Sequence, residues 1–213
     1  GRKLDQRMKE DIGVVLDDPG YPGCMTAAQI GKMLSGLYGG WEKDTFEGYL
    51  TTLRIPADKP FKDFSKGMKM KLCLAAALSH GAKLLILDEA TSGLDPVVRD
   101  ELLDIFNDFT RDEGNSVLIS SHIVSDLEKI CDYIAFLHRG KLMLCREKDE
   151  LLNEFTFVQG AKEEIDALAP IGRRDGRFGT EAIVRRNAVP EGMKTSPITI
   201  EDLFVFMAKE EKG

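Results

Sequence analysis

The chain has 213 residues, which is enough for one large domain or for one domain with a small addition. It carries 29 Lys and Arg residues against 36 Asp and Glu residues, a formal net charge of -7, without long blocks of like charge. Broad nucleic-acid binders take most of their affinity from a basic stripe, so this balance argues against that class of function. A local site for a small anion is compatible with it.

Hydropathy and cysteine usage indicate a cytoplasmic protein. The longest apolar run, residues 72–78, is far shorter than the ~20 residues that span a bilayer. The four cysteines form no CxxC pair, which is typical of reduced thiols, and we expect Cys73 and Cys131 to lie in the core. If the protein works at a membrane, another component must hold it there.

The first part of the chain predicts one strand followed by helices. A short apolar strand is stopped by an Asp-Asp-Pro-Gly turn at 17–20, and Thr26 and Ser65 are expected helix N-caps. In chain order, the predicted elements are a strand at 12–16 and helices at 27–37, 44–53 and 66–80.

From residue 83 onward, strands and helices alternate. The segment 83–87 is continuously apolar, as expected for a parallel strand that is covered on both faces. The predicted elements that follow are helices at 96–110 and 123–130 and strands at 116–120, 132–138 and 141–145. This order predicts an α/β fold with a mostly parallel sheet and a helical insertion.

The last part of the chain has a different pattern. It predicts helices at 147–154 and 201–209, strands at 155–159 and 182–185, and a loop at 172–179 where Gly and Arg are crowded. We therefore divide the chain into a core formed by 1–19 and 81–146, a helical subdomain at 20–80, and a small α+β C-terminal accessory region at 147–213.

Two adjacent acids, Asp88 and Glu89, follow the apolar strand at 83–87. Ligands of open parallel sheets bind beyond the carboxyl ends of the strands, where these acids are expected. Neighbouring carboxylates repel each other unless a cation or a polarised water lies between them, and phosphoryl transfer uses such a pair for Mg²⁺ and for the attacking water. The alternative is a solvated strand end with a purely structural role.

Three further features accompany this pair. Asp95 precedes Pro96, an ordinary helix start, and His122 follows the neighbouring strand, where it could reach a terminal phosphate. Ser65 and Gly67 begin a helix whose free N–H groups could receive a phosphate. Each feature alone also has a structural explanation: a helix cap, an exposed histidine or a simple Ser N-cap.

The order and spacing of these motifs over residues 10–145 resemble the ATP-binding-cassette (ABC) ATPases, which have a P-loop NTPase-like fold. The resemblance implies a signature loop at 64–68, a Walker B strand at 84–89, a D-loop at 92–95 and a switch histidine at 122. It implies Glu89 as the catalytic carboxylate, Asp88 as the Mg²⁺ partner, and His122 as a second catalytic residue. It also implies two ATP molecules sandwiched in a head-to-tail dimer with a second ATPase subunit.

Two motifs depart from the family pattern. In the signature loop, Lys66 replaces a Gly and Met68 replaces a Gln, whereas Ser65 and Gly67 are kept. Asp17 stands where the family has a Gln that reaches Mg²⁺ and senses the permease; a carboxylate could still bind magnesium through water. By the resemblance, Ser65, Lys66, Gly67, Asp95 and Asp17 contact the nucleotide or its metal.

The P-loop motif G-x-x-x-x-G-K-[ST] is not found in the 213 residues. Gly31-Lys32 is followed by Met, and Gly140-Lys141 is followed by Leu. We expect that an N-terminal segment with this loop and a sheet strand is missing, and that the chain alone binds ATP in roughly the millimolar range or more weakly.

The resemblance implies an ATP-hydrolysing subunit that powers a separate transmembrane permease from the inner face of the cell membrane. Residues 21–64 resemble the helical subdomain that docks on permease loops, and the chain is most similar to bacterial ABC-2-type exporters. Two alternatives are open: a non-catalytic fragment or binding module, and a soluble ABC ATPase that acts on DNA or ribosomes. The acidic balance argues against the latter and predicts no nucleic-acid partner.

Overall fold

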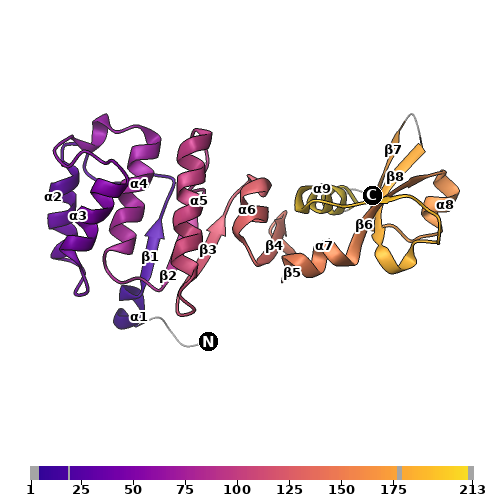
Figure 1. Cartoon of the computed structure of the whole chain (residues 1–213), viewed down its shortest axis with the longest axis horizontal. Coiled ribbons are helices and arrows are strands. Elements are labelled where there is room, and N and C mark those ends of the chain that lie inside the picture. Colours follow the sequence, from indigo (N-terminus) through magenta and orange to yellow (C-terminus); the bar gives the residue numbers. More distant parts are fainter. Residues whose placement is uncertain (1–4, 19, 177–178, 211–213) are drawn as a thin grey trace. The chain divides into compact units, whose positions relative to one another are not determined.

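The computed structural model describes residues 5–18, 20–176 and 179–210. The chain forms two compact units, Gly1–Ile123 and Val124–Gly213, which are described separately below (Figure 1). The first unit holds every predicted site residue.

A three-stranded parallel sheet forms the centre of the first unit. Its strands are β1 (Ile12–Val15), β2 (Leu84–Asp88) and β3 (Ser116–Ser120), in the order β1-β2-β3. Val15 pairs with Leu87, and Asp88 pairs with Ser120, so the carboxyl ends of the three strands meet at one edge of the sheet. The predicted parallel α/β arrangement is confirmed, and this edge is where the acids lie.

Helix α4 (Lys66–Leu78) packs on β1 and helix α5 (Pro96–Thr110) packs on β3. Leu85 and Leu87 of β2 are fully buried on one face of the sheet. On the other face Val14 is 52% exposed and Leu118 is 62% exposed. The expectation that the strand at 83–87 is covered on both faces is therefore wrong within this unit, because an apolar run cannot by itself specify a second covering layer.

The segment between β1 and β2 is helical, as predicted. It contains α2 (Ala27–Ser35), α3 (Lys43–Thr52), a 3₁₀ turn η1 (Phe61–Asp63) and α4. Thr26 caps α2 with a complete capping box to Gln29. Apolar side chains of all these elements form one core, with Ile30 and Leu72 fully buried in it.

The second unit has two antiparallel sheets. One is a hairpin of two strands, and the other has the order β7-β8-β6-β9. Leu151, Ile183, Ile200 and Leu203 form the centre of its apolar core. Its elements are α6 (Val124–Ile130), β4 (Tyr133–His138), β5 (Lys141–Glu147), α7 (Lys148–Glu154), β6 (Phe155–Gly160), α8 (Lys162–Asp166), β7 (Gly172–Gly176), β8 (Gly179–Arg185), η2 (Arg186–Ala188), β9 (Thr195–Ser196) and α9 (Ile200–Glu210).

The predicted loop at 172–179 is wrong where the structure describes it. Strand β7 occupies Gly172–Gly176 and pairs with β8, and Arg174 forms an ion pair with Glu181 across the two strands. Residues 177–178 lie outside the described part. Five further short elements, α1 (Gln6–Glu10), η1, α8, η2 and β9, were not predicted either.

Among the described helices, none has both the length and the apolar character needed to cross a bilayer. All four cysteines are free thiols: Cys73 is buried as expected, whereas Cys131 is only partly buried.

Candidate functional site

The site begins at the carboxyl ends of β2 and β3, where Asp88 and Ser120 pair across the two strands. The Ser120 hydroxyl donates a hydrogen bond of 2.6 Å to Oδ1 of Asp88. The backbone N–H of Glu89 donates to the carbonyl oxygen of Ser120 at 3.1 Å. These bonds fix the direction in which the chain leaves β2, and with it the place of both acids.

Glu89 has a positive φ of 52°. This left-handed conformation is uncommon for a residue with a side chain, and it persists only where the surroundings hold it. Here the bond to Ser120 and a turn in which the Ser92 N–H donates to the Glu89 carbonyl at 3.0 Å supply that support. The chain therefore bends sharply directly after Asp88.

This bend brings Glu89 to His122. Oε2 of Glu89 lies 2.7 Å from Nδ1 of His122, and the two side chains are 32% and 68% exposed. The residues are 33 positions apart, and the parallel pairing of β2 with β3 is what brings them together. A carboxylate and an imidazole at hydrogen-bonding distance, open to solvent, can orient a water molecule and a phosphate oxygen.

Asp95 follows in the turn after β2 and has the predicted structural role. Its Oδ1 accepts a hydrogen bond of 3.1 Å from the Val98 N–H, which caps α5, and Pro96 is the first residue of that helix. Gly93 has a φ of 67°, a conformation that suits glycine. The turn between Glu89 and Asp95 is thus held at both of its ends.

Ser65 and Gly67 lie at the start of α4. The Ser65 hydroxyl accepts a hydrogen bond of 3.3 Å from the Met68 N–H, as an N-cap does. A Cβ on Gly67 would lie 3.1 Å from Cγ1 of Val98, so glycine also permits the close packing of α4 on α5. Among the contacts of the described residues, none joins Ser65 or Gly67 to Glu89 or His122.

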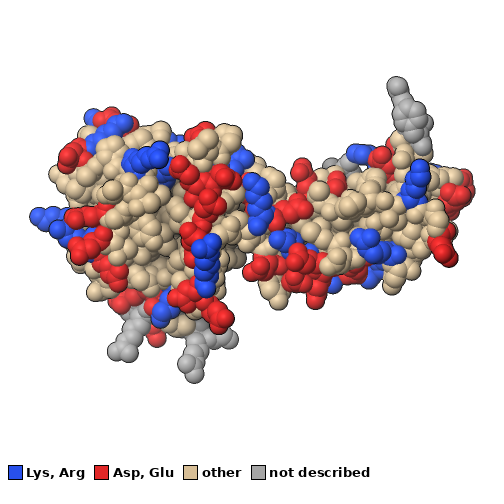
Figure 2. All heavy atoms as spheres, viewed as in Figure 1, with Lys and Arg blue, Asp and Glu red and all other residues tan. Residues whose placement is uncertain are grey.

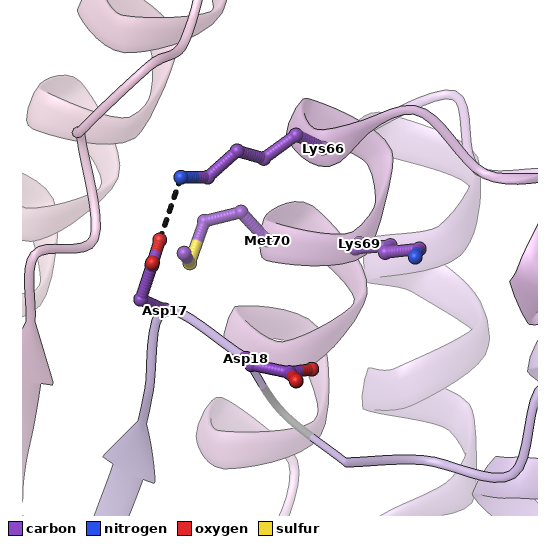
Figure 3. A pocket seen from close by; sticks show the side chains of 5 residues that line it. All are labelled: Asp17, Asp18, Lys66, Lys69 and Met70. Atoms are coloured by element: carbon purple, nitrogen blue, oxygen red, sulfur yellow. Dashed lines mark ion pairs between the residues drawn. The ribbon is translucent and has the colours of Figure 1, made fainter.

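Two of the three residues that depart from the family pattern, Asp17 and Lys66, are in contact. Nζ of Lys66 lies 2.6 Å from Oδ1 of Asp17, and the pair borders a cleft of about 320 Å³ with Asp18, Lys69 and Met70. Figure 3 shows the two side chains pointing toward one another, whereas Lys69 points away from Asp17. Asp17 and Lys66 belong to separate motifs and were interpreted separately from the sequence. The signal that could have linked them is their opposite charge.

Within the described residues, no group of three or more His, Cys, Asp or Glu side chains converges on a point where it could hold a metal ion. Of the acids assigned to magnesium, Asp88 is exposed at the strand end, whereas Asp17 is engaged by Lys66. The two carboxylates therefore have different surroundings: Asp88 is open to solvent, and Asp17 is paired with a cation.

Comparison with known proteins gives one family model, described as "AAA domain, putative AbiEii toxin, Type IV TA system", over residues 25–125. The bacitracin transport ATP-binding protein BcrA of Enterococcus faecalis is 35% identical over 62% of this chain and 44% of its own length. The lantibiotic transport ATP-binding protein SrtF of Streptococcus pyogenes is 38% identical over 70% of this chain and 65% of its own length. The chain thus spans less than two thirds of either relative.

Two solved structures have the same fold. An ATP-binding subunit of an ABC transporter superposes with a TM-score of 0.60 at 25% identity, over 68% of this chain and 62% of that chain. An ATP-binding cassette, solved as a dimer in a post-hydrolysis state with ADP and Pi, gives a TM-score of 0.59 at 17% identity over 68% of each chain. The second likeness shows the fold alone. Together they confirm the predicted P-loop NTPase-like fold.

One relative is matched over most of its length. The ABC transporter ATP-binding protein YhcH of Bacillus subtilis, itself uncharacterized, is 38% identical over 94% of this chain and 72% of its own length. On this match, the chain belongs to the family of ABC transporter ATP-binding proteins.

Proposed function

We propose that the protein is the ATP-hydrolysing subunit of an ABC transporter. The observation that carries the proposal is the 2.7 Å contact between Glu89 and His122 beyond the carboxyl ends of two parallel strands. In this proposal, Glu89 orients the water that attacks the terminal phosphate, and His122 contacts that phosphate. The partial exposure of both side chains supports the proposal, because a nucleotide must be able to reach them.

The oxygen donors at the strand end fit a magnesium ion, which protein sites usually hold through one or two carboxylates together with the substrate's phosphates. Asp88 would hold it, with one carboxylate oxygen already oriented by the Ser120 hydroxyl. When bound, Mg²⁺ would offset the negative charge that develops on the phosphate. Asp17 would take part through water only after leaving Lys66, and ATP would complete the site.

The relatives' names support a role in transport, because two of them are transport ATP-binding proteins for bacitracin and for a lantibiotic. We extend this to a separate transmembrane permease, a second ATPase subunit in a head-to-tail dimer, and a location at the inner face of the cell membrane. One structural neighbour is itself a dimer. Membership of the ABC-2-type exporter branch stays a prediction.

A role on nucleic acid is less well supported. On the face displayed in Figure 2, basic side chains stand among acidic ones instead of forming a continuous stripe. The net charge of -7 points the same way. Co-purification of the protein from cells would separate the two functions: recovery with a membrane permease supports the proposal, whereas recovery with nucleic acid or ribosomes contradicts it.

The proposed role of Glu89 is tested by Glu89→Gln in the full-length protein. We expect steady-state ATP hydrolysis to fall at least about a hundredfold, because the amide keeps the shape of the side chain but cannot act as a base. ATP binding, measured by isothermal titration, should be retained. Glu113→Gln, an exposed site just before the amino end of β3 and so at the opposite edge of the sheet from Glu89, is the matched control. Wild-type turnover in Glu89→Gln would refute the assignment.

A further inference from the structure

The Lys66 side chain lies beside two loops that follow different strands. Its ammonium lies 2.6 Å from Asp17, which follows β1. The same side chain also lies close to Gly93 in the turn after β2, since a Cβ built on Gly93 would be 3.5 Å from Nζ and 3.8 Å from Cδ of Lys66. One side chain at the start of α4 therefore pairs with the segment after β1 and lies beside the segment after β2.

The charges around this contact explain why a cation is needed there. Asp17 and Asp18 place two carboxylates beside the cleft, and Lys66 and Lys69 balance them. Of these cations, Lys66 is the one whose ion pair with Asp17 is seen, while Lys69 lies over the Phe61 ring at 5.1 Å. Without Lys66 or a metal ion beside it, an acid at position 17 would repel an anionic phosphate bound beyond the strands.

The pair is also easy to open. The Lys66 side chain is 43% exposed and the Asp17 side chain is 53% exposed. Water screens a pair at such positions, so its contribution to stability is small and it can be exchanged for other partners at little cost. A contact of this kind suits a loop that must adjust each time a nucleotide binds and leaves.

We propose that Lys66 is a positioning residue that acts through Asp17 and Gly93. It neutralises the carboxylate that stands in place of an uncharged side chain, and it holds the turn between Glu89 and Asp95 against the end of β1. The link to catalysis rests on the function proposed above, because this turn begins at Glu89. The positioning of the turn itself is a property of the nucleotide-free protein.

The first experiment measures amide hydrogen exchange in the nucleotide-free protein at Ser92 and Leu94, whose N–H groups close the turn. In Lys66→Met we expect exchange at these amides to accelerate about twofold to fivefold, the range that follows from losing an exposed ion pair. Lys66→Arg should restore protection. The double variant Asp17→Asn with Lys66→Met should be no worse than Lys66→Met alone, because no unpaired carboxylate is left.

Matched controls come from the same cleft. Lys69→Met and Asp18→Asn remove the same charges from neighbouring positions and should leave exchange at Ser92 and Leu94 unchanged. The proposal is overturned if Lys66→Met leaves these amides unchanged, or if the effects of Lys66→Met and Asp17→Asn simply multiply in the double variant. Either result would mean that Lys66 does not act through Asp17.

The second experiment compares kcat and KM for ATP hydrolysis by the full-length protein. Lys66→Met should lower kcat about twofold to fivefold or more while KM changes less, and Lys66→Arg should recover most of kcat. A change in KM alone would overturn a positioning role and point to direct nucleotide binding. If the wild-type protein shows no hydrolysis, the proposed function fails, and the exchange experiment still decides whether Lys66 positions the turn.

Discussion

Asp95 has an observed role as a helix cap and a role in nucleotide contact that the family resemblance implies. Two substitutions separate these roles. Its carboxylate caps α5 through Val98. We expect Asp95→Ala to lower the free energy of unfolding by about 1 kcal/mol, whereas Asp95→Asn, which caps a helix as well, should leave it unchanged. Urea denaturation measures this difference. If Asp95→Asn keeps full stability but lowers ATP hydrolysis, the carboxylate serves the nucleotide site; equal loss of stability in both variants would contradict the capping role.

The four thiols should differ in reactivity, because they differ in burial. Burial, with a further contribution from the Asp18 carboxylate, raises the pKa of the Cys73 thiol to about 12. Alkylation needs the thiolate, so Cys73 should stay unlabelled in the folded protein at pH 8, whereas the exposed Cys24 and Cys145 react. Mass spectrometry after iodoacetamide treatment checks this, with labelling in urea as the control. Rapid labelling of folded Cys73 would contradict its burial.

The raised pKa of Cys73 also determines how the stability of the protein changes at alkaline pH. Because the folded pKa of Cys73 lies above the unfolded value, its contribution to stability is complete below about pH 9 and is lost as pH rises toward 12. The unfolded chain releases the Cys73 proton first, so unfolding becomes easier with rising pH over this window. Cys73→Ala should therefore flatten the dependence of the urea midpoint on pH between about 9 and 11. An unchanged slope would contradict the raised pKa.

Among the individual residues of the site, some could be predicted from the sequence and others could not. Asp88, Glu89 and His122 follow apolar strands, and the parallel pairing of those strands is enough to bring Glu89 and His122 together. The ion pair of Asp17 with Lys66 was not predicted, because it joins a strand end to a helix start 49 positions away and neither local pattern contains the other. Only the packing of α4 on β1 makes them neighbours.

Two glycines in neighbouring helices test how tightly the helical segment is packed. A Cβ on Gly31 of α2 would lie 2.3 Å from the Phe46 ring of α3, whereas a Cβ on Gly48 of α3 would meet nothing within 4 Å. We expect Gly31→Ala to destabilise the protein by about 1–3 kcal/mol through overpacking. Gly48→Ala should stabilise it by about 0.5–1 kcal/mol through helix propensity.

Urea denaturation of both variants and of the wild type provides the measurement. Adding Phe46→Leu to Gly31→Ala should recover part of the loss, because the smaller side chain makes room for the new methyl group. A stabilising effect of Gly31→Ala would show that α2 and α3 separate easily and that the contact is loose.

Among the elements, those with strong periodicity or clear caps were predictable. Helix α5 (Pro96–Thr110) and strand β3 have the predicted bounds, because an Asp-Pro helix start and a short apolar run define them locally. Strand β7 was missed because its residues are Gly, Arg and Asp, with no apolar alternation. Its position depends on tertiary contacts: a Cβ on Gly172 would lie 2.8 Å from the Phe206 carbonyl oxygen of α9, so only glycine permits that approach.

At the scale of the whole molecule, the two compact units differ in what their sequences reveal. The first unit has motifs whose spacing is set by chemistry, and these motifs indicate a function without any knowledge of the three-dimensional structure. The second has no such motif. Its antiparallel sheet and buried core indicate a well-packed module, but they identify no ligand. Its contribution to the protein is therefore best approached through its folding.

We predict that residues 124–213 fold independently, because their core is made by their own side chains. Leu151, Ile183, Ile200 and Leu203 are almost completely buried. The isolated segment should unfold cooperatively in urea, as followed by circular dichroism. Ile183→Ala should lower its free energy of unfolding by about 2–5 kcal/mol through loss of buried volume. The exposed Leu142 provides the control, and Leu142→Ala should change it by less than about 0.5 kcal/mol. A gradual transition in the isolated segment would show that this core needs the rest of the chain to form.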